Sequence, residues 1–453
     1  KSQVTNSVAI SSTSSNLNDY TWHEESNIMQ GVTINLVPTE IMPIYLEQNN
    51  SKINFSVNPT SIMVNLDVNV NNQGYINIYK GKSIQNFIWQ DISFLTSTVG
   101  QHKLSVEWME PISGTIFYRE YIIYVVPKSS NLFIDNRCNT MRLWNGNDIN
   151  NEIPIILSPG FDAYNTKCEQ YYRAAGNNLV NCLLDKGFKI YVINYKFNPQ
   201  DMRNNAAIYA SAIKYISSIN NNQKVVAAGI SMGGVIARYA LAKAENDGVT
   251  LPVSKFISLD APQQYAIIDR ELQKFRKETT SGDVFAEYAS NNPAAKQLLV
   301  YNAYDDGGTI HNDFYNELNK LNGNGYPHLT ENIGVAFSTN KPNPYSGNWL
   351  RVDISPPLQQ ESKNFWLTDE LLVPGSYLPR VNVDPVAVSY GNYWWINLVT
   401  FPIMINKPVV SIIQYADPTF IPHKSALDLD ATGKSKFDKT IIPSVTGYHD
   451  VVP

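Results

Sequence analysis

Hydrophobic and polar residues alternate in short stretches over the first part of the chain. Between residues 40 and 127 these stretches, such as residues 75–79 and 121–126, are separated by clusters of Asn, Gly and Ser. Strict alternation is typical of half-buried strands, because successive side chains point to opposite faces. No amphipathic helical pattern interrupts the region. We therefore expect an all-β, immunoglobulin-like sandwich as an accessory domain over residues 19–130, after a flexible segment over residues 1–18.

Beyond a predicted linker over residues 127–131, continuous apolar stretches alternate with longer amphipathic ones. Short apolar runs are typical of strands buried on both faces of a parallel sheet. The expected strands cover residues 153–157, 188–193, 224–229, 255–260 and 333–338, and the expected helices cover residues 166–186 and 200–219 together with one that starts directly after residue 229. This rhythm predicts an α/β domain over residues 131–453, with a mostly parallel sheet flanked by helices.

A helix-rich insertion is expected between the last two of these strands. Residues 267–277, 284–300 and 312–321 show helical patterns, which is more helix than one crossover needs. We expect a helical cap over about residues 262–330. From Trp349 onward the chain is rich in proline, aromatic residues and short apolar runs, and the pattern predicts no order of elements there.

Composition and charge exclude two classes of function. The chain has 453 residues, 17% of them charged, a net charge of -5 and no basic cluster, which argues against a nucleic-acid surface. Its longest apolar candidate, residues 394–405, is shorter than the roughly 20 residues that cross a bilayer and contains Asn397 and Pro402, so we expect no transmembrane segment. The Ser/Thr/Asn-rich start without an initial Met favours an exported protein, secreted or at the cell surface.

The cysteines and acidic clusters predict no metal site. Cys138, Cys168 and Cys182 are too few for a disulfide framework and lack the paired spacing of a zinc site. One bridge with a spare thiol and three buried free thiols both remain open. The turn over residues 305–308 (DDGG) lacks the alternating oxygen ligands of a calcium loop and is better interpreted as a solvated turn.

The sharpest chemical motif is Gly-Ile-Ser-Met-Gly over residues 229–233. Glycines on both sides of Ser231 allow a tight turn between the preceding apolar strand and the following helix, which would hold the serine in a strained, exposed position. A serine hydroxyl is a poor nucleophile at neutral pH, so it needs a base, an orienting carboxylate and donors for the oxyanion. We interpret Ser231 as a nucleophile, against the alternative of a glycine-rich turn with an inert serine.

Two backbone amides are expected to form the oxyanion hole. The amide of Met232 opens the helix after the nucleophile, where the helix dipole favours negative charge. The second donor should come from a loop after an earlier strand, and residues 159–162 (PGFD) follow the strand expected at residues 153–157. Phe161 is the donor that we select there, against the alternative of an ordinary tight turn.

Together these motifs give the chain a family resemblance over roughly residues 150–453. It resembles the α/β-hydrolase superfamily, and within it bacterial lipase- or esterase-like proteins that pair a Pro-Gly-Phe-Asp loop with a Gly-x-Ser-Met-Gly-Gly elbow. Many relatives carry His-Gly in the loop, where this chain has Pro159 and Gly160. The resemblance implies a catalytic triad in the chain order serine, acid, histidine.

Asp260 is the predicted acid. It ends the strand that follows the nucleophile helix, which places it at the same sheet edge as Ser231. Some lipases place their acid there, whereas most of the superfamily uses the next strand, which here offers no carboxylate. Asp353 is the main alternative, and Asp305, Asp306 or no acid at all are the others.

The implied chain order leaves four histidines for the base: His311, His328, His423 and His449. The first two fall in or beside the expected cap, where an exposed polar histidine is the simpler explanation. The catalytic histidine of this superfamily usually lies on a loop near the end of the domain, which favours His449 over His423.

The resulting hypothesis is a serine hydrolase that cleaves carboxylic esters through an acyl-enzyme and needs no metal or cofactor. The ester could be a lipid, aryl, acetyl-sugar or polymer ester, and the accessory domain could contact such a surface or polymer. Two alternatives remain: a binding protein that keeps the hydrolase scaffold without turnover, and an amidase or peptidase on the same fold.

Overall fold

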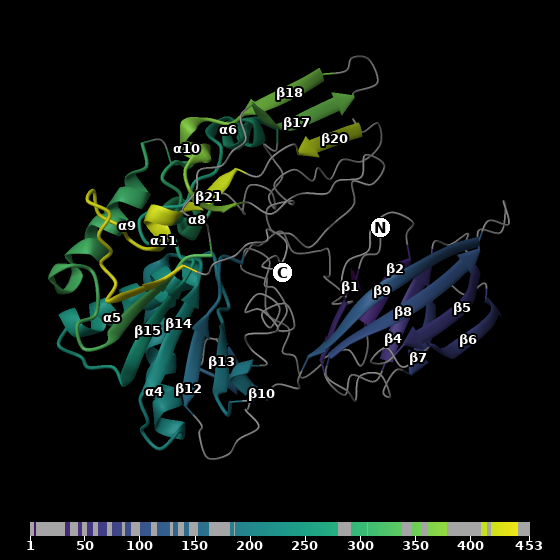
Figure 1. Ribbon diagram of the computed structural model, residues 1–453, viewed down its shortest axis with the longest axis horizontal. Coiled ribbons are helices and arrows are strands. Elements are labelled where there is room, and N and C mark those ends of the chain that lie inside the picture. The colour runs from purple at the N-terminus through teal and green to yellow at the C-terminus, as the bar shows by residue number, and fades with distance from the viewer. Residues whose placement is uncertain are drawn as a thin grey trace. The chain divides into compact units, whose positions relative to one another are not determined.

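The computed structural model describes the strands of the N-terminal part and most of the chain after residue 130. From there on the described residues are 130–134, 140–144, 153–162, 182–184, 186–279, 291–305, 307–337, 347–355, 361–377, 409–414 and 418–442. They fall into two compact units, the first within residues 1–129 and the second from Ser130 onward (Figure 1).

The first unit consists, as far as it is described, of strands in two sheets. The strands are β1 (Val4–Thr5), β2 (Val32–Leu36), β3 (Ile44–Glu47), β4 (Lys52–Val57), β5 (Ile62–Asn69), β6 (Tyr75–Ser83), β7 (Phe87–Asp91), β8 (Gly100–Met109) and β9 (Ile116–Val126). One sheet has the order β1-β2-β4-β7, and the other has the order β3-β9-β8-β5-β6. The alternating segments at residues 75–79 and 121–126 thus lie in strands, while the immunoglobulin-like sandwich stays a prediction.

The second unit is built on an eight-stranded sheet with the order β10-β11-β13-β12-β14-β15-β16-β22. Its strands are β10 (Ser130–Phe133), β11 (Thr140–Trp144), β12 (Pro154–Ser158), β13 (Lys189–Asn194), β14 (Val225–Ile230), β15 (Val253–Leu259), β16 (Glu331–Val335) and β22 (Lys439–Ile441). The pairs β10·β11 and β11·β13 are antiparallel, and the six strands from β13 to β22 are parallel. The predicted mostly parallel sheet is therefore confirmed. The linker expected at residues 127–131 is too long, because β10 already begins at Ser130.

Two long helices pack on this sheet beside β14, and Figure 1 shows α4 and the central strands in teal. The N-cap of helix α4 (Met202–Ile219) is Asp201, whose side chain accepts a hydrogen bond from the Arg203 amide at 2.9 Å. The helix α5 (Met232–Asn246) is buried without a break from Met232 to Ala242. A helix this deeply buried forms the centre of the core and gives its N-terminus a rigid base.

The insertion between β15 and β16 contains helices, as expected. They are α6 (Arg270–Thr279), α8 (Pro293–Leu298), α9 (Thr309–Lys320) and the 3-10 turn η3 (Leu321–Gly323). The expected helices at residues 267–277 and 312–321 are thus found with shifted ends. The one expected at residues 284–300 is a six-residue helix within its described part, and the helix expected at residues 166–186 lies largely outside the described residues.

The chain after Trp349 forms small antiparallel sheets that its pattern did not predict. One has the order β18-β17-β20, from β17 (Asn348–Ser355), β18 (Glu361–Trp366) and β20 (Val409–Gln414), and the other pairs β19 (Gly375–Tyr377) with β21 (Thr419–Pro422). The short helices α10 (Asp369–Leu372) and α11 (His423–Ala426) accompany them. β17 and β20 are far apart in sequence, and such non-local pairing leaves no local periodic signal.

Within the described part of the chain, no helix has both the length and the hydropathy needed to cross a bilayer. Cys182 is a free, exposed thiol, so the alternative of three buried free thiols is wrong. Cys138, Cys168 and the aromatic run near Trp394 lie outside the described residues.

Candidate active site

Ser231 occupies a strained turn between strand β14 and helix α5. Its backbone has φ 51° and ψ -125°, a region that non-glycine residues rarely adopt. The Ser231 amide donates to the Leu259 carbonyl at 2.9 Å, and the Ser231 carbonyl accepts from the Gly234 amide at 3.0 Å. The structure therefore contains the strand, turn and helix that the motif predicted, with hydrogen bonds on both sides of the strained residue.

Glycine is required on both sides of the serine because backbones meet there. A Cβ atom added to Gly229 would lie 2.2 Å from the carbonyl carbon of Gly233, and one added to Gly233 would lie 2.1 Å from the carbonyl oxygen of Ser158. Such contacts are far below van der Waals distance. The first turn of α5 is thus pressed against the ends of β14 and β12.

The loop after β12 lies directly beside Ser231. A Cβ atom on Gly160 would be 3.3 Å from Cβ of Ser231 and 3.8 Å from its Oγ. Phe161, the next residue, and Met232 are the predicted oxyanion donors, and Met232 is the first residue of α5, where amides lack a partner within the helix. The structure thus brings Gly160, the residue before Phe161, and the N-terminus of α5 next to the serine.

A buried asparagine holds that loop through both polar atoms of its side chain. Asn198 accepts a hydrogen bond from the Asp162 amide at 2.7 Å through Oδ1 and donates to the Gly160 carbonyl at 3.1 Å through Nδ2. Asn198 is 1% exposed. The sequence gives no indication of this role, because a single Asn in a turn after a strand carries no distinctive signal.

Asp260 lies at the end of β15, on the strand next to Ser231. The Ser231 amide binds the carbonyl of Leu259, the residue before Asp260, so the two residues meet at the carboxyl ends of adjacent parallel strands. Asp260 also has a positive φ of 45°, and Oδ1 accepts from the Phe337 amide at 3.0 Å. Burial raises the pKa of the Asp260 carboxyl to about 6, although hydrogen bonds from the Phe337 amide and the Ser376 hydroxyl act in the opposite direction.

The alternative acids lie in other places. Asp353 is in the middle of β17, paired with Ser362 and Ser411 in the three-stranded sheet. Asp305 accepts a hydrogen bond from the Ile310 amide at 3.0 Å, in the first turn of α9. Neither belongs to the eight-stranded sheet, and Asp306 lies outside the described residues.

The histidine selected as the base, His449, lies outside the described residues, so its role stays a prediction. Its alternative, His423, is the first residue of α11 and is 9% exposed, and burial lowers its pKa. The His423 amide donates to the Pro374 carbonyl at 2.8 Å, next to β19, the strand that carries Ser376. His423 is therefore fixed in the neighbourhood of the Asp260 hydrogen-bond network through its backbone.

Of the two histidines expected to be exposed, one is not. His311 is 6% exposed, and its Nδ1 lies 2.8 Å from the Gln297 carbonyl, so the expectation was wrong for it. The His311 ring faces inward because it packs against the Tyr315 ring and because α9 packs against α8. His328 is exposed, as expected, with Nε2 3.1 Å from Oδ1 of Asn324.

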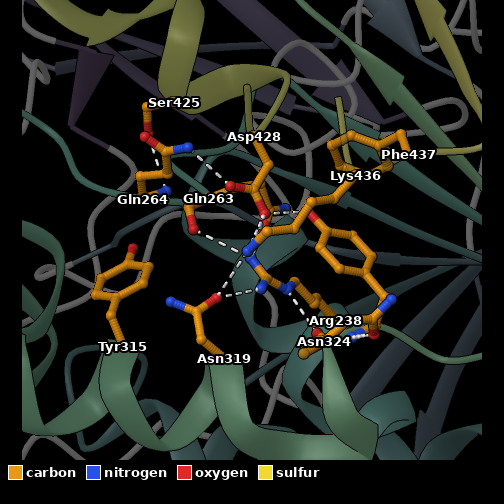
Figure 2. Close-up of polar contacts among 12 residues, drawn as sticks. Arg238, Gln263, Gln264, Tyr315, Asn319, Asn324, Ser425, Asp428, Lys436 and Phe437 are labelled. Atoms are coloured by element: carbon orange, nitrogen blue, oxygen red, sulfur yellow. Dashed lines mark hydrogen bonds and ion pairs between the residues drawn. The ribbon is translucent and has the colours of Figure 1, made fainter. Parts of the chain in front are cut away.

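A buried ion pair fixes the segment that follows Asp260. Figure 2 shows Arg238 of α5 reaching Asp428, at 3.2 Å, with 0% and 2% of their side chains exposed. The guanidinium also donates to Gln263, and Asp428 accepts from Gln264 and Tyr326 at 2.8 and 2.9 Å. A buried pair is tolerated when hydrogen bonds satisfy it in this way. The cluster joins α5, the chain after Asp260 and the turn after α11.

The described residues contain no group of three or more His, Cys, Asp or Glu residues placed to hold an ion.

Comparison with known proteins gives one match to a family and several to solved structures. The model of the family described as alpha/beta hydrolase fold matches residues 153–445. No curated protein matches the chain. Among solved structures, the chain is similar to the lipase BlEst2 of Bacillus licheniformis in its propeptide form, with 17% identity, a TM-score of 0.32, and coverage of 45% of this chain and 40% of that one. An esterase of Pyrobaculum calidifontis is 13% identical, with a TM-score of 0.32 and coverage of 46% and 66%.

Proposed function

Because the chain belongs to the alpha/beta hydrolase fold family, we propose that it is a serine hydrolase that cleaves carboxylic esters through an acyl-enzyme. The observation that carries the proposal is the conformation of Ser231. It sits at φ 51° between β14 and α5, with the Gly160 backbone beside its hydroxyl. Holding a residue in such a conformation costs about 1–3 kcal/mol of stability. A role as the nucleophile at the end of the sheet would explain why the strained conformation is retained.

The reaction follows from the position of the serine. In the first step, Oγ of Ser231 attacks the ester carbonyl while His449 takes its proton, and the carbonyl oxygen becomes an oxyanion. The amides of Met232 and Phe161 stabilise that charge. When the C–O bond of the ester breaks, His449 returns the proton to the leaving alcohol. A water molecule, deprotonated by His449, then attacks the acyl carbonyl, the bond between the acyl carbon and Oγ breaks, and His449 returns the proton to Ser231 as the acid is released.

We assign Asp260 as the carboxylate that orients the base, His449. Its support is the adjacency of the two strand ends, since the Ser231 amide binds the carbonyl directly before Asp260. A buried carboxylate at that place would hold the imidazole in one tautomer and stabilise the imidazolium that forms during attack. The Phe337 amide, 3.0 Å from Oδ1, fixes the orientation of the carboxylate.

The proposal predicts that a fluorophosphonate probe labels the protein at Ser231 and that p-nitrophenyl esters are hydrolysed. Tryptic mapping of the labelled protein would locate the modified residue. p-Nitrophenyl acetate, butyrate and palmitate would give the preferred acyl length, and the matching p-nitroanilides would test for amide cleavage. If no ester is turned over and no label is found on Ser231, the scaffold is a binding protein and the proposal is wrong.

Labelling rates also test the choice of base. We expect His449→Ala to slow fluorophosphonate labelling of Ser231 by about 10²–10⁴-fold, because a general base contributes that much to proton transfer. His423→Ala is the matched comparison and should leave the labelling rate within about twofold, provided that circular dichroism shows a folded protein. The reverse pattern would make His423 the base.

A further inference from the structure

We infer that Asn198 is a positioning residue that aims the Phe161 amide at the oxyanion, an inference that rests on the proposed esterase function. Asn198 lies in the turn between β13 and α4 and is 1% exposed. Its side chain bridges the loop after β12, since Oδ1 accepts from the Asp162 amide at 2.7 Å and Nδ2 donates to the Gly160 carbonyl at 3.1 Å.

The Gly160 carbonyl and the Phe161 amide belong to one planar peptide unit. In a trans peptide the C=O and N–H bonds point in opposite directions, and the described residues contain no cis bond. A hydrogen bond from Asn198 to that carbonyl therefore sets the direction of the Phe161 N–H on the far side of the peptide. The hydrogen bond to the Asp162 amide prevents the neighbouring peptide from turning with it.

Gly160, whose Cα belongs to the same peptide unit, lies next to the nucleophile. A Cβ atom on Gly160 would be 3.8 Å from Oγ of Ser231, so a rotation of this peptide would change the donors around the reacting carbonyl. An oxyanion donor must be aimed before the charge develops, because reorientation during the reaction costs free energy. Asn198 supplies this preorganisation from outside the site and does not itself touch the substrate.

Asn198 is in turn held by residues of α4 and its preceding turn. Asn205, which is 0% exposed, donates through Nδ2 to the Asn198 carbonyl at 2.8 Å. Gln200 donates to Oδ1 of Asn205 at 2.6 Å. A side chain whose two polar atoms serve two neighbouring peptides needs both a donor and an acceptor, and the amide of asparagine provides them on one short side chain.

The test compares Asn198→Ala and Asn198→Asp with the wild type in p-nitrophenyl butyrate hydrolysis. The Asp variant is nearly isosteric and keeps the acceptor for Asp162, but it places a carboxylate oxygen against the Gly160 carbonyl. We expect kcat to fall by about 10²-fold in both variants, the loss associated with one oxyanion donor, while KM changes by less than about twofold. The inhibition constant of a boronic acid, whose tetrahedral adduct places an oxygen at the oxyanion position, should rise in parallel with the loss of kcat.

Asn220→Ala is the control for a structural role. Asn220 is a buried asparagine at the other end of α4, where Nδ2 donates to the Tyr191 hydroxyl at 3.0 Å. This variant should lower Tm with kcat and boronate inhibition unchanged. If the two Asn198 variants behave in the same way, Asn198 is merely structural and the inference is wrong. A wild-type protein that hydrolyses no ester and is not labelled by the fluorophosphonate would instead contradict the proposed function itself.

Discussion

Ser231→Ala is expected to lower kcat for p-nitrophenyl ester hydrolysis by about 10⁶-fold, the loss found when the nucleophile of a serine hydrolase is removed. The substitution removes only the hydroxyl, and without Oγ no acyl-enzyme can form. The residual rate over water would come from the oxyanion donors and substrate binding. KM should change little, because the hydroxyl contributes to bond making and hardly to binding.

The fold should tolerate this substitution. Alanine, like serine, has a Cβ atom, so the strain at φ 51° is the same in both proteins. The bonds from the Ser231 amide to Leu259 and from the Gly234 amide to the Ser231 carbonyl involve the backbone alone. Tm should therefore move by no more than a few degrees.

Ser211→Ala is the matched control for that measurement. Ser211 is an exposed serine of α4 whose hydroxyl bonds the Ala207 carbonyl within the helix. We expect full activity and fluorophosphonate labelling from this variant. A Ser231→Ala protein that retains more than about 1% of the wild-type kcat would contradict the assignment of the nucleophile.

The parallel sheet and the elbow could be predicted from the sequence because their signals are local. The run before Ser231 was expected at residues 224–229 and is β14 (Val225–Ile230), a shift of one residue. A strand buried on both faces has to be apolar throughout, and a turn in which backbones touch has to contain glycine. Both requirements can be recognised within a few neighbouring residues.

Other parts of the site depend on contacts between distant residues. The partners of Asp260 are the Phe337 amide, which lies just after β16, and the Ser376 hydroxyl of β19, and neither belongs to a motif. Asn198 reaches the loop after β12 from a turn that follows the next strand. A buried polar group must be paired, but the sequence alone does not say with which group.

The inward-facing histidine illustrates the same limit. His311 has a polar, ionisable side chain, and its neighbours on α9 are mainly polar too, so exposure was the natural expectation. In the fold its ring lies tilted against the ring of Tyr315, and its Nδ1 hydrogen-bonds with the Gln297 carbonyl. Burial was decided by the packing of α9 on α8, which composition does not reveal.

The buried carboxyl of Asp260, next to the strained turn, makes the stability of the fold depend on pH. Its folded-state pKa is raised from 3.8 to about 6 by burial. The folded protein therefore binds this proton more tightly than the unfolded chain does. The stabilising contribution is fully present below pH 3.8 and is lost as the pH rises through about 6. Above that pH the ionised carboxylate destabilises the fold, by at most about 3 kcal/mol.

Asp260→Asn is therefore expected to lower activity and raise stability at pH 8. The amide keeps an acceptor oxygen for the Phe337 amide but carries no charge, so the free energy of unfolding should increase by about 1–3 kcal/mol at pH 8 and by little at pH 4. In the same protein kcat should fall by about 10⁴-fold, because an amide neither selects the productive imidazole tautomer nor stabilises the imidazolium. Urea unfolding at the two pH values and ester kinetics at pH 8 measure both effects.

Asp353→Asn is the control and should leave kcat within about twofold, since Asp353 lies in the β18-β17-β20 sheet. A large loss of kcat in Asp353→Asn, with an active Asp260→Asn, would transfer the role of the acid to Asp353.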